Sequence, residues 1–405
     1  MTAPELPEHW FRHEFGRLVA VLSRKLGAAR MELCEDAAQT ALLRATRTWA
    51  RSGVPDDRGA WLYRVAFNAA LDALRKERRV DHVDVEESVP PEDVFLASEV
   101  PDDLLRLLFV CADPVIPSES QLVLALKTLC GFSTEEIALR LFQSEEAIHK
   151  RLQRARARLR ESLDLGTPPL DALGERRPRV LQTIYLLFNE GYSSAQPDCV
   201  IRRELCEEAV RLALILLDHP LGAAPEVFAL LALMYFHAAR FDARIDGAGG
   251  LLLLEDQDRS LWDGELVRLG FTALQASGTP RTRFHVEAAI SAEHCIAPTY
   301  AATDWAQITR LYEVLERLEP SPIHALNRAI ALAEWKGPDA GLAVLEALKP
   351  PGWLAGYYLW DAALGELYRR RGDRERARRH LASALASAPT NAEKDLLARR
   401  LASAS

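Results

Sequence analysis

The chain has 405 residues, of which 49% are hydrophobic and 27% charged, the balance of a folded protein with two or three domains. No apolar run approaches the ~20 residues of a membrane span, and the N-terminus lacks the pattern of a signal peptide, so we expect a cytoplasmic protein without membrane contact. The six cysteines form no Cys-x-x-Cys pair, which argues against a disulfide framework or a zinc ribbon.

The net charge of −8 hides an uneven distribution. Residues 1–80 carry 14 basic and 10 acidic side chains, whereas residues 81–100 carry seven acids and no Lys or Arg. Between Lys150 and Arg160, six basic side chains follow one another with no acid among them. Local clusters therefore say more about partners than the total charge does.

Almost every segment has the composition and the three- and four-residue apolar spacing of α-helix, so we predict an all-α fold. The first unit covers residues 9–80, with helices over Trp10–Leu26, Cys34–Trp49 and Trp61–Arg78. Turn-forming residues at 52–57 predict the loop between the last two helices.

An acidic, proline-containing linker over residues 81–101 precedes a second unit at 102–165. There, Ser133 or Thr134 is a candidate N-cap for a short helix, with Ala138 at the helix crossing. Leu139 and Leu141 are available to the core. A turn at Phe142–Gln143 and a cap at Ser144 then predict a second helix.

That second helix spans Glu145–Glu161 and has apolar positions that repeat at intervals of four, three and four, namely Ile148, Leu152, Ala155 and Leu159. These positions face inward, so the basic residues between them face outward, the layout of a helix-turn-helix recognition helix. Its first residues can reach base edges and its arginines can reach phosphates. The alternative is a solvated amphipathic helix with an arginine-rich face.

The helix that begins at Trp61 is rich in aromatic residues and ends in Arg75, Lys76, Arg78 and Arg79. Aromatic rings beside basic groups suit the stacking of unpaired bases together with phosphate neutralisation. In the alternative interpretation, Trp61, Val65 and Phe67 are simply core.

The remaining chain, about residues 175–405, is predicted to be helical, with tetratricopeptide-like repeats near 324–391. The 34-residue repeat pattern is met by Leu364, Gly365, Tyr368, Ala377, Leu381, Ala384 and Pro389. A weaker copy with one inserted residue consists of Leu326, Asn327, Ile330, Ala340, Val344 and Ala347. We therefore expect two stacked helical hairpins.

Three other features of this part allow more than one interpretation. The Tyr185–Tyr192 segment is either a contact between domains or a helix end capped by Gly191. The acidic cluster at 255–265 has the residues of a metal site or a glycosidase pair, but Arg259 and Arg268 favour a buried ion-pair network. The His and Cys spacing does not fit zinc, and no catalytic constellation is visible, so we expect no metal, no cofactor and no enzyme activity.

Several stretches resemble a known family. Glu35–Gln39, Arg58–Asn68 and Asp72–Arg75 resemble region 2 of extracytoplasmic-function (ECF) bacterial sigma factors, and residues 132–160 resemble their region 4. Tyr185–Tyr192, Leu254–Trp262 and Thr303–Trp305 are similar to signatures of the ECF subgroup with a tetratricopeptide-like C-terminal domain.

The resemblance implies a sigma factor that binds core RNA polymerase and directs promoter recognition and transcription initiation. Asp36, Gln39, Leu43, Arg44 and Arg47 would then bind the polymerase. Residues expected at promoter DNA are, around the −10 element, Trp61, Arg64, Asn68, Asp72, Arg75, Arg78 and Arg79, and, around the −35 element, Glu145, His149, Lys150, Arg151, Arg154 and Arg156.

The subgroup also implies that the C-terminal domain is a regulatory or interaction module, with no dedicated anti-sigma factor and with a small YCII-like protein as a further partner. We expect this domain to pack against region 2 or region 4. Asp102, Asp103 and Glu119 leave region 4 nearly neutral, which predicts weak DNA binding by the free protein. The alternative function is a tetratricopeptide scaffold protein with a degenerate, non-transcribing helix-turn-helix.

Overall fold

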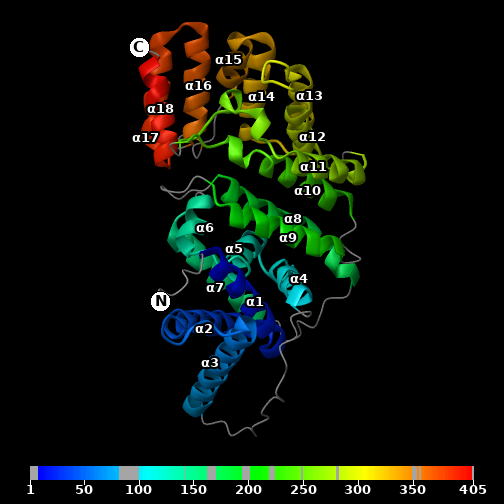
Figure 1. Ribbon diagram of the computed structural model, residues 1–405, viewed down its shortest axis with the longest axis vertical. Helices are drawn as coiled ribbons and strands as arrows, with labels where there is room; N and C mark the ends of the chain where they lie inside the picture. Colours follow the sequence, from blue (N-terminus) through cyan, green and yellow to red (C-terminus); the bar gives the residue numbers. More distant parts are fainter. Residues whose placement is uncertain are drawn as a thin grey trace. The chain divides into compact units, whose positions relative to one another are not determined.

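The computed structural model describes residues 8–81, 100–141, 143–161, 170–193, 201–218, 224–247, 250–279, 282–348, 354 and 357–403. The chain divides into an N-terminal unit, residues 1–187, and a C-terminal unit, residues 188–405. All regular elements of the described residues are helices (Figure 1), so the all-α prediction is confirmed. The acidic linker falls largely outside the described residues.

The N-terminal unit begins with three long helices, α1 (Glu8–Leu26), α2 (Met31–Ser52) and α3 (Arg58–Asp81). They are the three predicted from the sequence, each a few residues longer. Small residues on the inner face of α2 are fully buried, which lets α1 and α3 pack closely against it. Gly53, with φ of 82°, ends α2 and starts the predicted loop.

Four further helices follow in the N-terminal unit: α4 (Val100–Cys111), α5 (Ser118–Thr128), α6 (Thr134–Arg140) and α7 (Glu145–Glu161). Ser133 caps α6 through a reciprocal capping box with Glu136. Ser144 accepts a hydrogen bond from the Ala147 amide at the start of α7. The helix-turn-helix is therefore formed as predicted, apart from Phe142, which lies outside the described residues.

The predicted inner stripe of α7 is confirmed, because Ile148, Leu152, Ala155 and Leu159 are all buried. Leu139, in contrast, is 53% exposed on α6, so its assignment to the core is wrong. Leu139 follows the buried Ala138 and lies on the solvent-facing side of α6.

Helix α8 (Leu170–Tyr192) contains the boundary between the two units, which falls after Leu187. In its N-terminal half, Arg176 lies 2.7 Å from Asp113 and donates a hydrogen bond to the Phe109 carbonyl at 3.1 Å. Both charged side chains are almost fully buried. This contact fixes the first half of α8 to the segment that joins α4 and α5.

The C-terminal unit contains the end of α8 and ten α-helices among the described residues. They are α9 (Arg203–Asp218), α10 (Pro225–Ala238), α11 (Gly264–Ser277), α12 (Arg283–Ile296), α13 (Trp305–Leu318), α14 (Pro322–Lys336), α15 (Pro338–Ala347), α16 (Tyr358–Arg371), α17 (Arg374–Ser387) and α18 (Asn391–Ser403). Successive helices from α12 to α18 pack on one another, the pattern of a helical stack (Figure 1).

The two predicted hairpins are present as α14–α15 and α16–α17. In the second, a Cβ on Gly365 would lie 2.7 Å from the Leu381 side chain, which explains the small residue at the crossing. In the first, the proposed second-helix register is wrong, because Gly341 and Leu345 face the partner helix rather than Ala340 and Val344.

Two interpretations of the C-terminal part are corrected. Gly191 lies inside α8 and is not its cap; a Cβ there would lie 2.6 Å from the Cys206 sulfur, so it is a helix-crossing residue. The acidic cluster forms no buried ion-pair network: Asp258 and Asp263 cap helices, and Arg259 donates to backbone carbonyls.

Within the described residues, no helix is long and apolar enough to cross a membrane, and no group of His, Cys, Asp or Glu could hold a metal ion.

Candidate nucleic-acid and polymerase interface

One face of α3 presents exposed polar side chains. Arg64, Asn68, Asp72 and Arg75 are all exposed and lie at three- and four-residue spacing, so they share that face. Asp72 and Arg75 lie 3.6 Å apart and are both open to solvent. The side chains of Arg78 and Arg79 lie outside the described residues.

Trp61, at the start of the same helix, belongs partly to the core. Its ring lies 5.3 Å from that of Trp49, which in turn contacts Trp10 at 5.7 Å. Trp61 remains half-buried, so one part of the ring is in contact with the core and another is accessible. Both interpretations of its role are therefore compatible with its position.

The outward face of α2 carries all five residues assigned to polymerase binding, and each is exposed: Asp36, Gln39, Leu43, Arg44 and Arg47. Leu43 is 56% exposed although it is a large aliphatic residue. A solvent-facing leucine surrounded by charged and amide groups is a suitable anchor for a protein partner.

The first turns of α7 are also free to approach DNA. Glu145, His149 and Lys150 are exposed, and their contacts run along the helix surface. His149 lies 3.6 Å from Glu145, and Lys150 lies 2.7 Å from Glu146. Such exposed pairs are weak, so a base edge can replace them at small cost.

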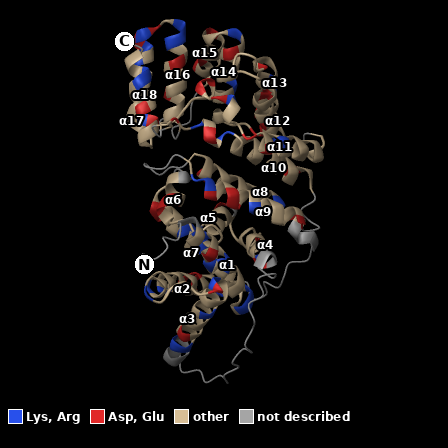
Figure 2. Ribbon diagram, viewed as in Figure 1, with Lys and Arg blue, Asp and Glu red and all other residues tan. Residues whose placement is uncertain are grey.

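Arg151 and Arg154 both point toward Glu119, at the start of α5. Arg154 lies 3.0 Å from that carboxylate, and both side chains are about half exposed. Arg151 lies 3.4 Å from it and is more buried. The basic residues of α7 (Figure 2) are thus partly neutralised by the chain itself.

Arg156 departs from the sequence expectation. It forms an ion pair with Glu35 of α2 and lies 3.4 Å from Glu32, with only 16% of its side chain exposed. Arg160 lies 4.0 Å from Glu32. We call these four residues the Arg156 clasp. The prediction that every basic side chain of α7 faces outward is therefore wrong for Arg156.

Burial dominates the electrostatics of this clasp. The Glu35 side chain is 7% exposed, and burial raises the pKa of its carboxyl above the usual range, although Arg156 and Lys127 oppose the rise. One Glu35 oxygen and the Arg156 Nε have no hydrogen-bond partner among the described residues. The ion pair thus joins α7 to α2, but it does not fully replace the hydrogen bonds with water that its charged groups lose on burial.

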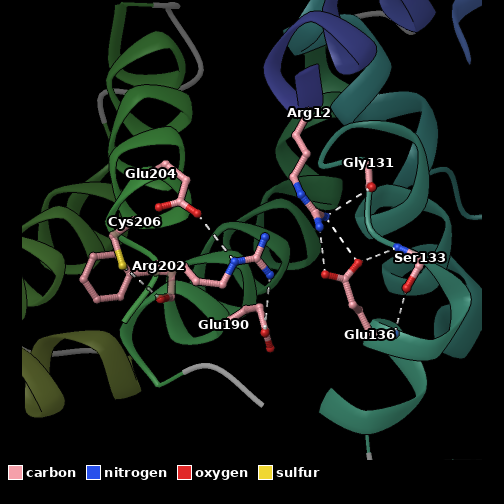
Figure 3. A network of polar contacts seen from close by, with 9 residues as sticks. Arg12, Gly131, Ser133, Glu136, Glu190, Arg202, Glu204 and Cys206 are labelled. Atoms are coloured by element: carbon pink, nitrogen blue, oxygen red, sulfur yellow. Dashed lines mark hydrogen bonds and ion pairs between the residues drawn. The ribbon is translucent and has the colours of Figure 1, made fainter. Parts of the chain in front are cut away.

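A second contact joins α1 to the helix-turn-helix (Figure 3). The Arg12 guanidinium lies 2.8 Å from Glu136, the acidic member of the capping box, and donates to the Gly131 carbonyl at 3.3 Å. Arg24 of α1 also pairs with the buried Asp103 of α4 at 3.1 Å. The first three helices therefore bind the following helices at three places.

Sequence reasoning did not find the clasp, Arg12–Glu136 or Arg24–Asp103. Glu35 is part of a stretch that resembles region 2, and no sequence pattern singles out Arg12. The acidic spacing of Glu32 and Glu35 marks one face of α2, but no local pattern shows that it meets a helix more than a hundred residues further along.

A three-helix unit with an exposed polar helix face, joined to a helix-turn-helix, defines a DNA-binding protein with two modules. The comparisons specify the family. Residues 10–80 match the family description Sigma-70 region 2, and residues 116–159 match Sigma-70, region 4. The RNA polymerase sigma-E factor of Streptomyces antibioticus is 35% identical over 140 residues, covering 34% of this chain and 73% of that protein.

The chain therefore belongs to the sigma-70 family of RNA polymerase sigma factors and is of the ECF type. It is a promoter-recognition sigma factor, and domains of these two kinds bind core RNA polymerase and promoter DNA. Sigma factors are generally not enzymes.

The similarity extends into the C-terminal unit. Residues 176–278 match a family of unknown function, DUF6596. The uncharacterized protein R00370 of Rhizobium meliloti (strain 1021) is 36% identical over 397 residues, covering 93% of this chain and 92% of that protein. No solved structure matches the chain.

Proposed function

We propose that the chain acts on the polymerase and the promoter through three separate faces. The outward face of α2, centred on Leu43, binds core polymerase. The polar face of α3 that contains Asn68 captures bases of the −10 element, and the first turns of α7 contact the −35 element. One observation carries the proposal. Helices α2 and α3 pack on each other as a hairpin, yet the α2 face around Leu43 and the α3 face around Asn68 are both exposed.

The Arg156 clasp adds a condition to this proposal. Arg156 can hold a phosphate only after it leaves Glu35, because its guanidinium is already paired and largely buried. The clasp also places the end of α7 against the first turn of α2, next to Asp36. We therefore propose that region 4 separates from region 2 when the protein engages both polymerase and promoter.

The C-terminal unit is proposed to be the regulatory or interaction module. Its support is a hydrophobic core of its own, built from α14 to α18, together with a length greater than a tether would require. Tetratricopeptide character, packing on region 2 or region 4, and the YCII-like partner stay predictions from the resemblance.

The direct test is run-off transcription with core polymerase, with and without the full chain, on promoters of the source genome. Initiation that depends on the chain is the expected result. If no promoter is ever initiated, the proposal fails.

The polymerase face is tested by Asp36→Arg combined with Gln39→Ala, which should weaken co-purification with core polymerase while the far-UV circular dichroism is unchanged. Asp395→Arg is the control, because Asp395 is exposed on α18 in the C-terminal unit and is not part of this face. Equal co-purification of all three proteins would remove the polymerase assignment.

The −10 face is tested by Asn68→Ala. Base capture needs an edge-contacting group, so this change should reduce open-complex formation, followed by permanganate footprinting, more than closed-complex binding in a gel shift. Lys76→Ala removes an exposed charge elsewhere on α3 and should lower both measurements together. Equal loss of both in Asn68→Ala would contradict the assignment.

A further inference from the structure

A cavity of about 640 Å³ lies within the C-terminal unit. Its walls come from helices α12, α13, α14, α16 and α18, and residues of the Leu251–Glu255 segment line another part of it. This volume is within the range of sites that hold small organic molecules. Neither promoter recognition nor polymerase binding, as proposed above, uses any of the residues that line it.

One wall is aromatic. The Trp305 ring lies 5.0 Å from Tyr300 and 5.3 Å from His294, and Tyr312 and Tyr358 line the same space. Two large aliphatic side chains on the cavity wall stay accessible, Ile330 at 37% and Leu359 at 40%. Accessible apolar surface inside a concave site gains free energy when a ligand covers it.

The polar part of the lining carries a negative excess. Four carboxylates line the cavity against three guanidinium groups: Glu255, Glu334, Glu366 and Glu393 against Arg369, Arg370 and Arg400. Figure 2 shows that both acidic and basic residues lie on α16 and α18. The guanidinium groups are all engaged, since Arg370 pairs with Glu334, Arg369 with Glu366, and Arg400 with Glu255.

Within the lining, carboxylates outnumber guanidinium groups by one, while Arg244, which lies outside the lining, interacts electrostatically with Glu393. Burial raises the pKa of Glu255, and the neighbouring carboxylates Asp256, Glu366 and Glu334 raise it further, while Arg400 opposes them. The fourth carboxylate, Glu393, accepts hydrogen bonds from the Tyr358 hydroxyl and from Thr390. A bound cation would favour the ionised form of these carboxylates.

His294 lines the cavity with an uncharged ring. Its Nδ1 is buried and has no hydrogen-bond partner among the described residues, although the residue lines the cavity. Burial, Arg240 and Arg259 lower the pKa of His294 to about 3, so the ring is neutral and adds no positive charge.

We propose that this cavity binds a small organic cation, a compact apolar or aromatic body that carries one ammonium or guanidinium group. The aromatic wall and the accessible Ile330 and Leu359 would hold the apolar body. Aromatic faces together with Glu255, whose side chain is 49% exposed, would hold the charge. The volume of about 640 Å³ and the Glu255–Arg400 ion pair in the lining favour a small molecule over an extended peptide.

The test compares three probes on the full chain by saturation-transfer NMR and titration: 2-phenylethylamine, the anionic 3-phenylpropionate, and a capped peptide that contains lysine and phenylalanine. We expect 2-phenylethylamine to bind with a Kd of about 1 mM, as befits so small a molecule. The anion should bind at least roughly tenfold more weakly, because it meets excess carboxylate.

Ile330→Trp fills the cavity from its wall and should abolish binding of the amine. Leu318→Trp is the matched control, since Leu318 is exposed on α13 but is not part of the cavity, and it should bind as the wild type does. Preference for the anion, binding that survives Ile330→Trp, or absence of binding would overturn the proposal. Tighter binding of the peptide than of the amine would show a peptide groove instead. Because none of these outcomes involves transcription, they are independent of the sigma function.

Discussion

Replacing Arg156 by alanine should release region 4 from region 2. The change removes the main cation of the clasp and leaves the Glu35 carboxylate buried beside α7, where Lys127 still interacts with it. A charge that stays in a water-poor site without its partner is costly. The α7–α2 contact should therefore open far more often.

The magnitude follows from how deeply the pair is buried. Glu35 is 7% and Arg156 16% exposed, so solvent screening is weak, and removal of one partner costs about 3 kcal/mol. That free energy corresponds to a roughly hundredfold increase in the population with region 4 released. The exposed Glu32 contributes little to this figure, since exposed pairs are worth about 0–1 kcal/mol.

The double variant, Arg156→Ala with Glu35→Gln, removes the buried charge as well. The neutral amide has a smaller burial cost, so most of the lost stability should return. Glu35→Gln alone leaves the buried Arg156 guanidinium with the exposed Glu32 as its remaining carboxylate partner, so it should also weaken the contact. Recovery of stability in the double variant would show that Arg156→Ala weakens the contact through the buried charge of Glu35 and not through lost packing alone.

Amide hydrogen exchange of the full chain measures these opening free energies at the end of α7 and the start of α2. Arg154→Ala is the control. It truncates another arginine of α7, whose partner Glu119 is exposed. Exchange that is equal in Arg156→Ala and Arg154→Ala, or a double variant as open as the single one, would refute the reasoning.

Two further predictions concern other parts of the chain. Arg154→Ala should weaken promoter binding across all sequences and reduce the salt dependence by about one unit of slope, measured by gel shift at several salt concentrations; a change in base preference would contradict the phosphate assignment. Gly191→Ala should destabilise the C-terminal unit by about 1–3 kcal/mol in denaturant unfolding, because its Cβ would overlap the Cys206 sulfur. Gly174→Ala, on the same helix with no atom within 4 Å of the added carbon, should be neutral or stabilising, and an equal loss in both would remove the crossing explanation.

Local sequence patterns predicted the elements of the promoter-binding part. The capping box at Ser133 and the inner stripe of α7 depend on residues three or four apart, so neighbouring side chains determine them. The exposure of the α2 face that contains Leu43 follows in the same way, because its inner positions are small and apolar.

Contacts between distant segments could not be predicted in this way. Arg156 looked like its neighbours on α7, and only the packing of α7 near the start of α2 turns it from a solvent-facing group into a buried partner of Glu35. Gly191 showed the same limitation: its sequence context suited a helix end, whereas its lack of a side chain serves the crossing with α9. In both cases, tertiary packing determined the role.

The pH dependence of the clasp follows from the direction of the Glu35 pKa. Burial raises that pKa above its usual 4.5, so the joined arrangement binds the proton more tightly than the released one does. Its stability relative to release is therefore fully present below about pH 4.5 and is lost as the pH rises through the raised pKa. Arg156 is the group that lowers the Glu35 pKa most, so this pKa is higher still in Arg156→Ala. The joined arrangement of this variant therefore continues to lose stability up to a higher pH. The exchange-derived cost of Arg156→Ala, taken relative to the double variant with Glu35→Gln, should thus shrink on acidification from neutral pH. Lys127 and Asp36 act on the Glu35 carboxyl only in Arg156→Ala, where Lys127 lowers its pKa and Asp36 raises it. A cost that stays constant with pH would mean that the Glu35 charge does not set the strength of the contact.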